Sequence, residues 1–311
     1  MDRELARVHL IAFPGVQNLP NFAAEANGFF ARRGLAIETT FTKSSQQQRT
    51  GLARGDYDIA HSAVDNAVAM TDLAGEHVAI VVGLDHGFNK LIVRPGIATY
   101  DDLRGKTFGV DAPDTAFALV VYDMLERNGL EPGDYQVKSV GATRFRLEAL
   151  VAGDVDFAML NLPFNLFAQR AGLAVLDDPM NVIGAYQSTG GFVKRAWAER
   201  HRDALVQYIA AYVEGLRWSL DPQNRAAAIE LLKQRMELAP DIAEECFRQV
   251  SDAKTGFAKD AKLDRAGMTK LLELRANFAA AANAPAVSPD RYIDETYYRD
   301  ALVALRSSIE N

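Results

Sequence analysis

Two histidines and one aspartate stand at positions where they could move protons. His61 and Asp65 lie four residues apart across an expected strand-to-helix turn, and His86 lies on an expected crossover between two halves of the chain. An imidazole beside a carboxylate can act as a general acid–base pair because the histidine pKa lies near neutral pH. If the protein is an enzyme, these three residues are its candidate catalytic groups. The sequence lacks a Ser-His-Asp order, paired catalytic carboxylates, a phosphate-binding loop and a His-Glu-x-x-His motif, so binding is the more direct hypothesis.

A larger set of polar and aromatic side chains stands in loops that follow expected strands. Hydroxyl and amide groups there can donate or accept hydrogen bonds with a small solute, and phenylalanine rings can stack on a planar one. The candidate ligand-binding residues are Phe13, Gln17, Asn18, Lys43, Ser44, Ser45, His61, Ser62, Asp65, Asn66, His86, Asp111, Thr115, Phe117, Thr143, Arg144, Asn161, Phe164 and Asn165.

The charges in these loops do not point to one ligand. Lys43 and Arg144 are the basic residues of the loops and suit an anion. Asp65, Asp85 and Asp111 instead suit a ligand with hydrogen-bond donors or positive charge. The mixture favours a neutral or zwitterionic ring compound over a bare sulfonate. Several of the hydroxyl residues have an alternative role, because serine and threonine are also good helix N-caps. No metal site is expected.

The loops are positioned by a sequence motif that the chain contains twice, once at 52–60 and once at 150–158. Each copy contains the end of an expected helix, a glycine (Gly55 or Gly153), an acidic turn and a short apolar strand. Glycine suits the left-handed backbone position just past a helix C-terminus. Similar elements precede each copy at similar offsets, so the sequence predicts β-α-β-α-β twice.

Two similar lobes with a cleft between them follow from this repeat. The fold class is α/β, with lobe I formed by residues 1–86 and 187–311, lobe II by residues 87–186, and hinges near Gly83–Phe88 and Gly184–Gln187. The pattern also predicts a helix over Pro20–Arg33, a strand near Val182–Tyr186 and a helical C-terminal tail. The expected helices of that tail are Arg195–Leu220, Gln223–Glu237, Pro240–Val250, Asp264–Ala282 and Ile293–Ser307, with a break at 283–289.

Composition limits the partners and the compartment. The 311 residues carry 34 Lys+Arg and 41 Asp+Glu, a net charge of −7, so we expect no nucleic-acid partner. The one cysteine, Cys246, excludes an internal disulfide and is expected to pack in the core. The start of the chain has no apolar signal-peptide core. We therefore expect the cytoplasm if Met1 is the native start, and the periplasm if a signal peptide was removed.

Several sequence motifs together resemble those of the type II periplasmic substrate-binding proteins of ABC importers. The resemblance is to the branch that binds taurine, alkanesulfonates, nitrate or thiamine-precursor pyrimidines. Residues 25–35 (EANGFFARRGL) are similar to that branch's A-x-x-x-G-F-F-x-x-x-G-L helix. Residues 52–60 (LARGDYDIA) are similar to its A-L-x-x-G-x-x-D-I-A motif, and residues 100–110 (YDDLRGKTFGV) are similar to its D-L-K-G-K-x-V-G-V motif.

The resemblance implies a two-lobed protein that captures a small organic solute, such as a ring compound, a sulfonate or a pyrimidine, in the interlobe cleft. It implies a membrane permease as partner, no cofactor and a monomeric chain. The alternative is a cytoplasmic enzyme on the same fold, such as a decarboxylase or a pyrimidine-modifying enzyme acting on a small aromatic or heterocyclic substrate. The cysteine-rich motif of the fungal pyrimidine synthase is absent.

Overall fold

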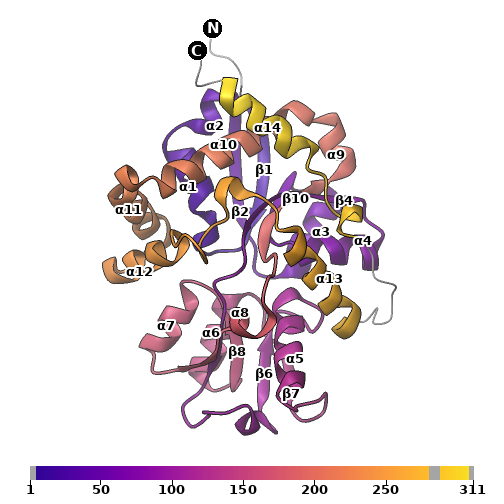
Figure 1. Cartoon of the computed structure of the whole chain (residues 1–311), viewed down its shortest axis with the longest axis vertical. Helices are drawn as coiled ribbons and strands as arrows, with labels where there is room; N and C mark the ends of the chain where they lie inside the picture. The colour runs from indigo at the N-terminus through magenta and orange to yellow at the C-terminus, as the bar shows by residue number, and fades with distance from the viewer. Residues whose placement is uncertain (1–4, 280–287, 308–311) are drawn as a thin grey trace.

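Two five-stranded sheets divide the structure into two lobes, which lie at the top and the bottom of Figure 1. The computed structural model describes residues 5–279 and 288–307. In spatial order, the first sheet contains β2 (Leu35–Phe41), β1 (Ala6–Ala12), β3 (Ile59–Ala63), β10 (Thr189–Lys194) and β4 (Val78–Asp85). The second contains β7 (Gln136–Ser139), β6 (Thr107–Val110), β8 (Phe157–Leu160), β5 (Lys90–Val93) and β9 (Ala174–Asp177).

The two sheets share one topology. In the first, β1 pairs with β2 and β3 in parallel, and β10 runs antiparallel between β3 and β4. In the second, β6 pairs with β7 and β8 in parallel, and β5 runs antiparallel between β8 and β9. The chain passes between the sheets twice, from β4 to β5 and from β9 to β10. This arrangement confirms the two-lobed α/β fold, while the residue boundaries of the lobes remain a prediction.

Helices cover both sheets and extend the first lobe (Figure 1). The helices that connect strands are α1 (Leu19–Ala26), α2 (Phe29–Arg32), α3 (Ser45–Arg54), α4 (Asp65–Ala74), α5 (Ala116–Arg127), α6 (Thr143–Ala152), α7 (Phe164–Arg170) and α8 (Pro179–Ile183). The helical tail contains α9 (Arg195–Arg200), α10 (Arg202–Leu220), α11 (Arg225–Met236), α12 (Pro240–Val250), α13 (Arg265–Phe278) and α14 (Thr296–Ser307).

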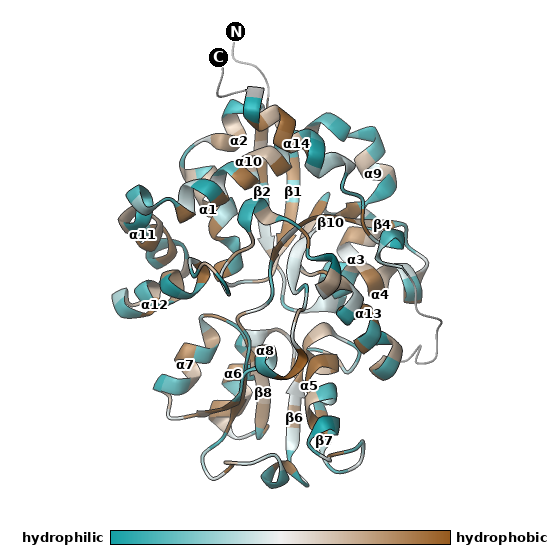
Figure 2. Ribbon diagram, in the orientation of Figure 1, coloured by the Kyte–Doolittle hydropathy of each residue, from teal (hydrophilic) through white to brown (hydrophobic). Residues whose placement is uncertain are grey.

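The first lobe is held together by the packing of α10 on α1 and α2. Tyr208 and Tyr212 of α10 are fully buried, and the Tyr208 ring stacks on Phe30 with centroids 5.5 Å apart. Gly215 lets the two helices approach, because a β-carbon there would lie 2.2 Å from the Pro20 carbonyl oxygen. Cys246 is buried in the same core, as predicted. In Figure 2, α12 and α13 alternate hydrophilic and hydrophobic residues, the pattern of helices with one face in a core.

The repeated sequence motif, at 52–60 and 150–158, forms the same structure in both lobes. Gly55 ends α3 and Gly153 ends α6, each in the left-handed conformation with φ of 82°. The strands β3 and β8 then follow, with Ile59 and Phe157 fully buried. The glycine-ended helix predicted for each copy is therefore confirmed.

Several expected elements differ in the structure. The expected helix over 20–33 is broken into α1 and α2, since Gly28 takes a left-handed conformation with φ of 68°. The expected helix over 195–220 is α9 followed by α10. The strand expected near 182–186 is wrong: Asp178 caps the short helix α8 there, accepting a hydrogen bond from the Met180 N–H. The strand that returns to the first sheet is β10. Parts of the expected elements at 264–282 and 283–289 fall on residues 280–287, outside the described residues.

Candidate functional site

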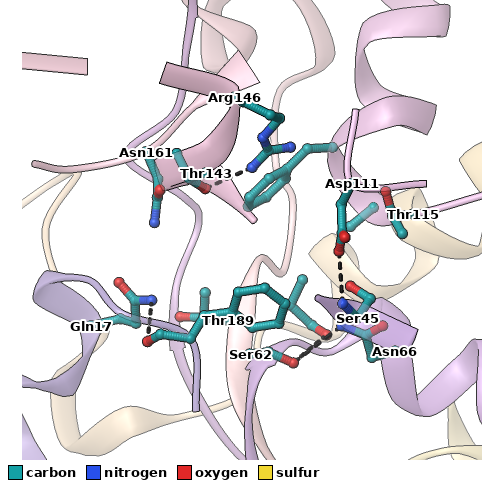
Figure 3. A pocket seen from close by; sticks show the side chains of 14 residues that line it. Gln17, Ser45, Ser62, Asn66, Asp111, Thr115, Thr143, Arg146, Asn161 and Thr189 are labelled. Carbon is teal, nitrogen blue, oxygen red and sulfur yellow. Dashed lines mark hydrogen bonds between the residues drawn. The ribbon is translucent and has the colours of Figure 1, made fainter. Parts of the chain in front are cut away.

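A cavity of about 50 Å³, partly open to solvent, lies between the two lobes (Figure 3). Its lining residues from the first lobe are Phe13, Gln17, Ser45, Ser62, Ala63, Asn66 and Thr189, and those from the second are Asp111, Thr115, Ala116, Phe117, Thr143, Arg146 and Asn161. The pattern of the sequence predicts every lining residue except Ala63, Ala116, Arg146 and Thr189.

The carboxyl ends of two parallel strands in each sheet bring these residues together. Phe13 follows β1, Ser62 lies near the end of β3, Asp111 follows β6 and Asn161 follows β8. In an open α/β sheet the loops after the carboxyl ends of the strands converge at one edge. Here the converging edges of the two sheets face each other, so the cavity receives side chains from both lobes.

Arg146 is the buried cation of the cavity. Its side chain is 3% exposed, and its Nη2 donates a hydrogen bond of 2.6 Å to Thr143 Oγ1. The guanidinium carbon lies 5.7 Å from the centre of the Phe117 ring. Among the described residues, no carboxylate lies within 4.0 Å of it, and its Nε has no hydrogen-bond partner. Burial lowers the pKa of Arg146 to about 10, against the opposing effect of the negative charge of Asp111, so the group stays charged at neutral pH.

Asp111 takes part in one of several contacts that join the lobes beside the cavity. Its Oδ2 accepts a hydrogen bond of 2.9 Å from the backbone N–H of Ser45, at the start of α3. The backbone N–H of Ala142 donates to the Lys43 carbonyl at 3.1 Å, and Arg49 pairs with Asp114 at 3.5 Å. These contacts join the two lobes beside the cavity.

A chain of hydrogen bonds fixes the orientation of Asn66. Gln48 Nε2 donates to the backbone carbonyls of Ile11 and His61, which leaves Gln48 Oε1 to accept from the Ser62 hydroxyl at 2.6 Å. Ser62 Oγ then accepts from Asn66 Nδ2 at 3.2 Å. Asn66 Oδ1 is left without a donor, as is Asn161 Oδ1 in the opposite lobe. Both asparagines thus supply unsatisfied acceptors to the cavity walls.

His61 lies behind the cavity wall and is not one of the lining residues. Its Nε2 lies 3.1 Å from the Tyr208 hydroxyl, and its ring is 4.8 Å from the Tyr212 ring, centre to centre. Burial lowers the pKa of His61 to about 3, because the charged imidazolium would be out of reach of water. The imidazole is therefore neutral at physiological pH.

The other two candidate acid–base residues have partners of their own. Asp65 Oδ1 accepts from Arg275 Nη1 at 2.8 Å, and both side chains are buried. Burial opposes the charge of Arg275, but Asp65 outweighs it and raises the pKa of the guanidinium. His86 Nδ1 lies 3.1 Å from the Tyr186 carbonyl and 3.5 Å from Asp264 Oδ2. The structure does not combine His61, Asp65 and His86 into one catalytic group.

The remaining candidates also lie outside the cavity, in structural or exposed positions. Asn18 binds the carbonyls of the turn before α1, Ser44 caps α3 through the Gln47 N–H, and Asn165 donates to the Phe88 carbonyl. The Phe164 ring packs on Phe167. Lys43 is exposed, and Arg144 is exposed and pairs with Glu148 on the surface of α6.

Metal and membrane features are absent from the part of the chain that the structure describes. Within residues 5–279 and 288–307, no group of three or more His, Cys, Asp or Glu side chains could hold a metal ion. Within the same ranges, no helix has both the length and the apolar character required to cross a bilayer.

Comparison with known proteins identifies the family. Residues 16–226, more than half of the chain, match the NMT1/THI5-like family. The chain belongs to this family. Among curated relatives of this NMT1/THI5-like chain, the bicarbonate transport ATP-binding protein CmpC of Synechococcus elongatus is 24% identical over 242 residues. The match covers 71% of the chain but 36% of CmpC, so the chain spans about a third of the length of this relative.

Solved structures share the fold of this NMT1/THI5-like chain. The periplasmic nitrate-binding protein NrtA of Synechocystis PCC 6803 superposes with a TM-score of 0.80 at 15% identity, over 97% of this chain and 89% of NrtA. The alkanesulfonate-binding protein SsuA of Xanthomonas axonopodis pv. citri, bound to MOPS, gives a TM-score of 0.74 at 16% identity, over 91% and 96% of the two chains. The two-lobed periplasmic-binding-protein fold that the sequence predicts is confirmed.

Proposed function

We propose that the chain is a solute-binding protein that captures a small organic molecule between its lobes and delivers it to an ABC importer. The observation that carries the proposal is the cavity, since both lobes supply polar groups to it from opposite sides. The fold supports the proposal, because NrtA and SsuA are binding proteins and CmpC belongs to a transport system. Because NrtA is periplasmic, we also propose the periplasm as the compartment.

Closure of the lobes is the proposed mechanism. A solute that contacts both lobes stabilises the closed arrangement by its greater affinity for that state. The proposed hinges are the two connections between the sheets, where Gly87 and Gly184 have φ of 96° and 72°. Gln187 ties one connection to its surroundings, because its side chain donates to the Thr189 carbonyl and accepts from the Asp264 N–H.

Binding is favoured over catalysis by the positions of the candidate acid–base residues. His61 is neutral and buried behind the wall, and Asp65 is neutralised by Arg275. Neither side chain lines the cavity, so neither is placed to transfer a proton to a molecule inside it.

Native mass spectrometry of the purified protein, followed by denaturing extraction, tests the proposal. We expect one intact solute per chain, either co-purified or taken up from a panel of aromatic carboxylates, sulfonates and pyrimidines and recovered unchanged. Asn66→Ala and Asn161→Ala should each lower the bound fraction with little loss of stability, since both side chains face the cavity with an unpaired oxygen. Conversion of a panel compound into a product would contradict the proposal, and so would a protein that takes up none of them.

A further inference from the structure

We infer that the solute carries a negatively charged oxygen group, such as a carboxylate, a sulfonate or a phosphate ester, which binds at Arg146 and Thr143. The inference rests on the proposed function and names the chemical class of its ligand. It arises from a contrast between the two buried arginines of the described structure, Arg146 and Arg275.

Each buried arginine needs a counter-ion, but among the described residues only Arg275 has one in direct contact. The negative charge of Asp111 favours the charged form of Arg146 without forming an ion pair with it. Arg275 is 6% exposed and pairs with Asp65 at 2.8 Å. Arg146 is 3% exposed and lies within 4.0 Å of no carboxylate in the described residues. A charge removed from water is costly unless an opposite charge compensates for it. Since Arg146 lines the cavity, an anionic solute can supply that compensation.

The groups around Arg146 are arranged to donate hydrogen bonds. Its Nε has no partner, and Thr143 Oγ1 already accepts from Nη2, so the threonine hydroxyl proton is left for another acceptor. Both residues lie at the start of α6, where the helix dipole adds partial positive charge. In Figure 3 the Arg146 and Thr143 side chains lie side by side on the second-lobe wall. The part of this wall formed by Arg146 and Thr143 fits an oxyanion.

The cavity also presents acceptors away from the Arg146–Thr143 pair. In the first lobe Asn66 Oδ1 is an acceptor without a donor, and in the second lobe the Asp111 carboxylate accepts from the Ser45 N–H. Phe13 and Phe117 supply the apolar surface of the walls. The inferred solute is therefore an organic acid with a planar or apolar body and an N–H or O–H donor away from the acid group.

Isothermal titration calorimetry with matched pairs of probes tests the inference. The acids are 4-aminobenzoate, 4-aminobenzenesulfonate and 4-aminophenyl phosphate, and the neutral partners of the first two are 4-aminobenzamide and 4-aminobenzenesulfonamide. We expect at least one acid to bind, and to bind about 10-fold or more tightly than its neutral partner, because charge-assisted hydrogen bonds to guanidinium are lost in the amide. Which acid binds best distinguishes carboxylate, sulfonate and phosphate.

Two variants at arginines two residues apart on α6 locate the binding group. Arg146→Met should weaken binding of that acid by about 100-fold, the usual scale for truncating one member of a buried charge pair. Arg144→Met, a change to the exposed arginine of the same helix, should leave affinity within about two-fold. Arg146→Lys should keep a preference for the acid over the amide.

The outcomes separate this inference from the proposed function. Equal binding of acid and amide, or an Arg146→Met variant that binds the acid as well as the parent does, overturns the anion inference and leaves solute binding intact. Failure of every probe, with no solute co-purified, overturns both. Ligand-free Arg146→Met should unfold at the parent temperature or above it, because a buried charge without an ion-pair partner is removed. Unfolding far below that temperature would show that the guanidinium is structural, and would also overturn the inference.

Discussion

Burial decides the role of individual side chains in this protein. His61 and Asp65 have the residue types and spacing of an acid–base pair, yet each is bound to a different partner below the cavity wall. Arg144 and Arg146 differ in the same way, since the first is exposed and the second is 3% exposed. Residue type alone could not separate these cases.

Helix periodicity contains the signal for Arg146. Thr143 faces the cavity, and a residue three positions further along a helix lies on the same face, whereas the next residue along does not. Arg146 is at that position, and Arg144 is the next residue after Thr143. The sequence prediction included Arg144, in an expected loop, among the candidate residues and did not include Arg146, which lines the cavity.

His61 should make the protein sensitive to acid. Its pKa is about 3 in the folded protein and about 6.5 in an unfolded chain, so below pH 6.5 the unfolded state binds a proton that the folded state does not. This contribution to stability is present above pH 6.5 and is lost as the pH falls towards 3. Between pH 7.5 and pH 5.0 the free energy of unfolding should fall by about 2 kcal/mol more in the parent than in His61→Gln.

Urea denaturation of both proteins at the two pH values provides the measurement. Other titrating groups are common to both proteins, so the difference between them isolates His61. Equal pH dependence in the parent and in His61→Gln would mean that His61 does not hold its low pKa in the folded protein.

At the scale of elements, β10 is the strand that the sequence pattern misses. It contains Gly190 and Gly191 in succession, a pair that usually marks a turn and has low strand propensity. The structure explains both glycines by close approach. A β-carbon on Gly190 would lie 2.4 Å from the Val82 carbonyl oxygen, and one on Gly191 would lie 2.6 Å from His61 Nε2.

The short helix α8 was missed for a related reason. Val182 and Ile183 are apolar and β-branched, which favours a strand by local propensity. The stronger signal lies just before them, where Asp178 and Pro179 form an N-cap followed by proline at the first helical position.

The tight packing of β10 predicts a loss of stability on Gly190→Ala. Since the methyl group would meet backbone atoms of β4, the strands must separate, at a cost of about 1–3 kcal/mol in the free energy of unfolding. Thr39→Ala on the exposed edge strand β2 is the control and should change that free energy by about 0.5 kcal/mol or less. Urea denaturation measures both. A Gly190→Ala variant as stable as the parent would show that β10 does not pack this closely against β4.

For the whole molecule, the repeat in the sequence was sufficient to predict the architecture. Two copies of one sequence motif, in which Gly55 and Gly153 end a helix, predicted two similar lobes. The ends of the strands in these lobes predicted most of the residues of the cavity wall. What the repeat could not predict is how the lobes meet. The contact of Asp111 with Ser45 and the addition of Thr189 by β10 depend on packing between distant segments.

A crystal structure of the protein with the solute that co-purifies, or with the tightest-binding acid probe, is the most direct test of solute capture between the lobes. We predict the solute in the cavity, in contact with side chains of both lobes and with its acid group within hydrogen-bond distance of Arg146. A solute in the groove beside Tyr122, Tyr135 and Phe278, or in contact with one lobe alone, would contradict capture between the lobes.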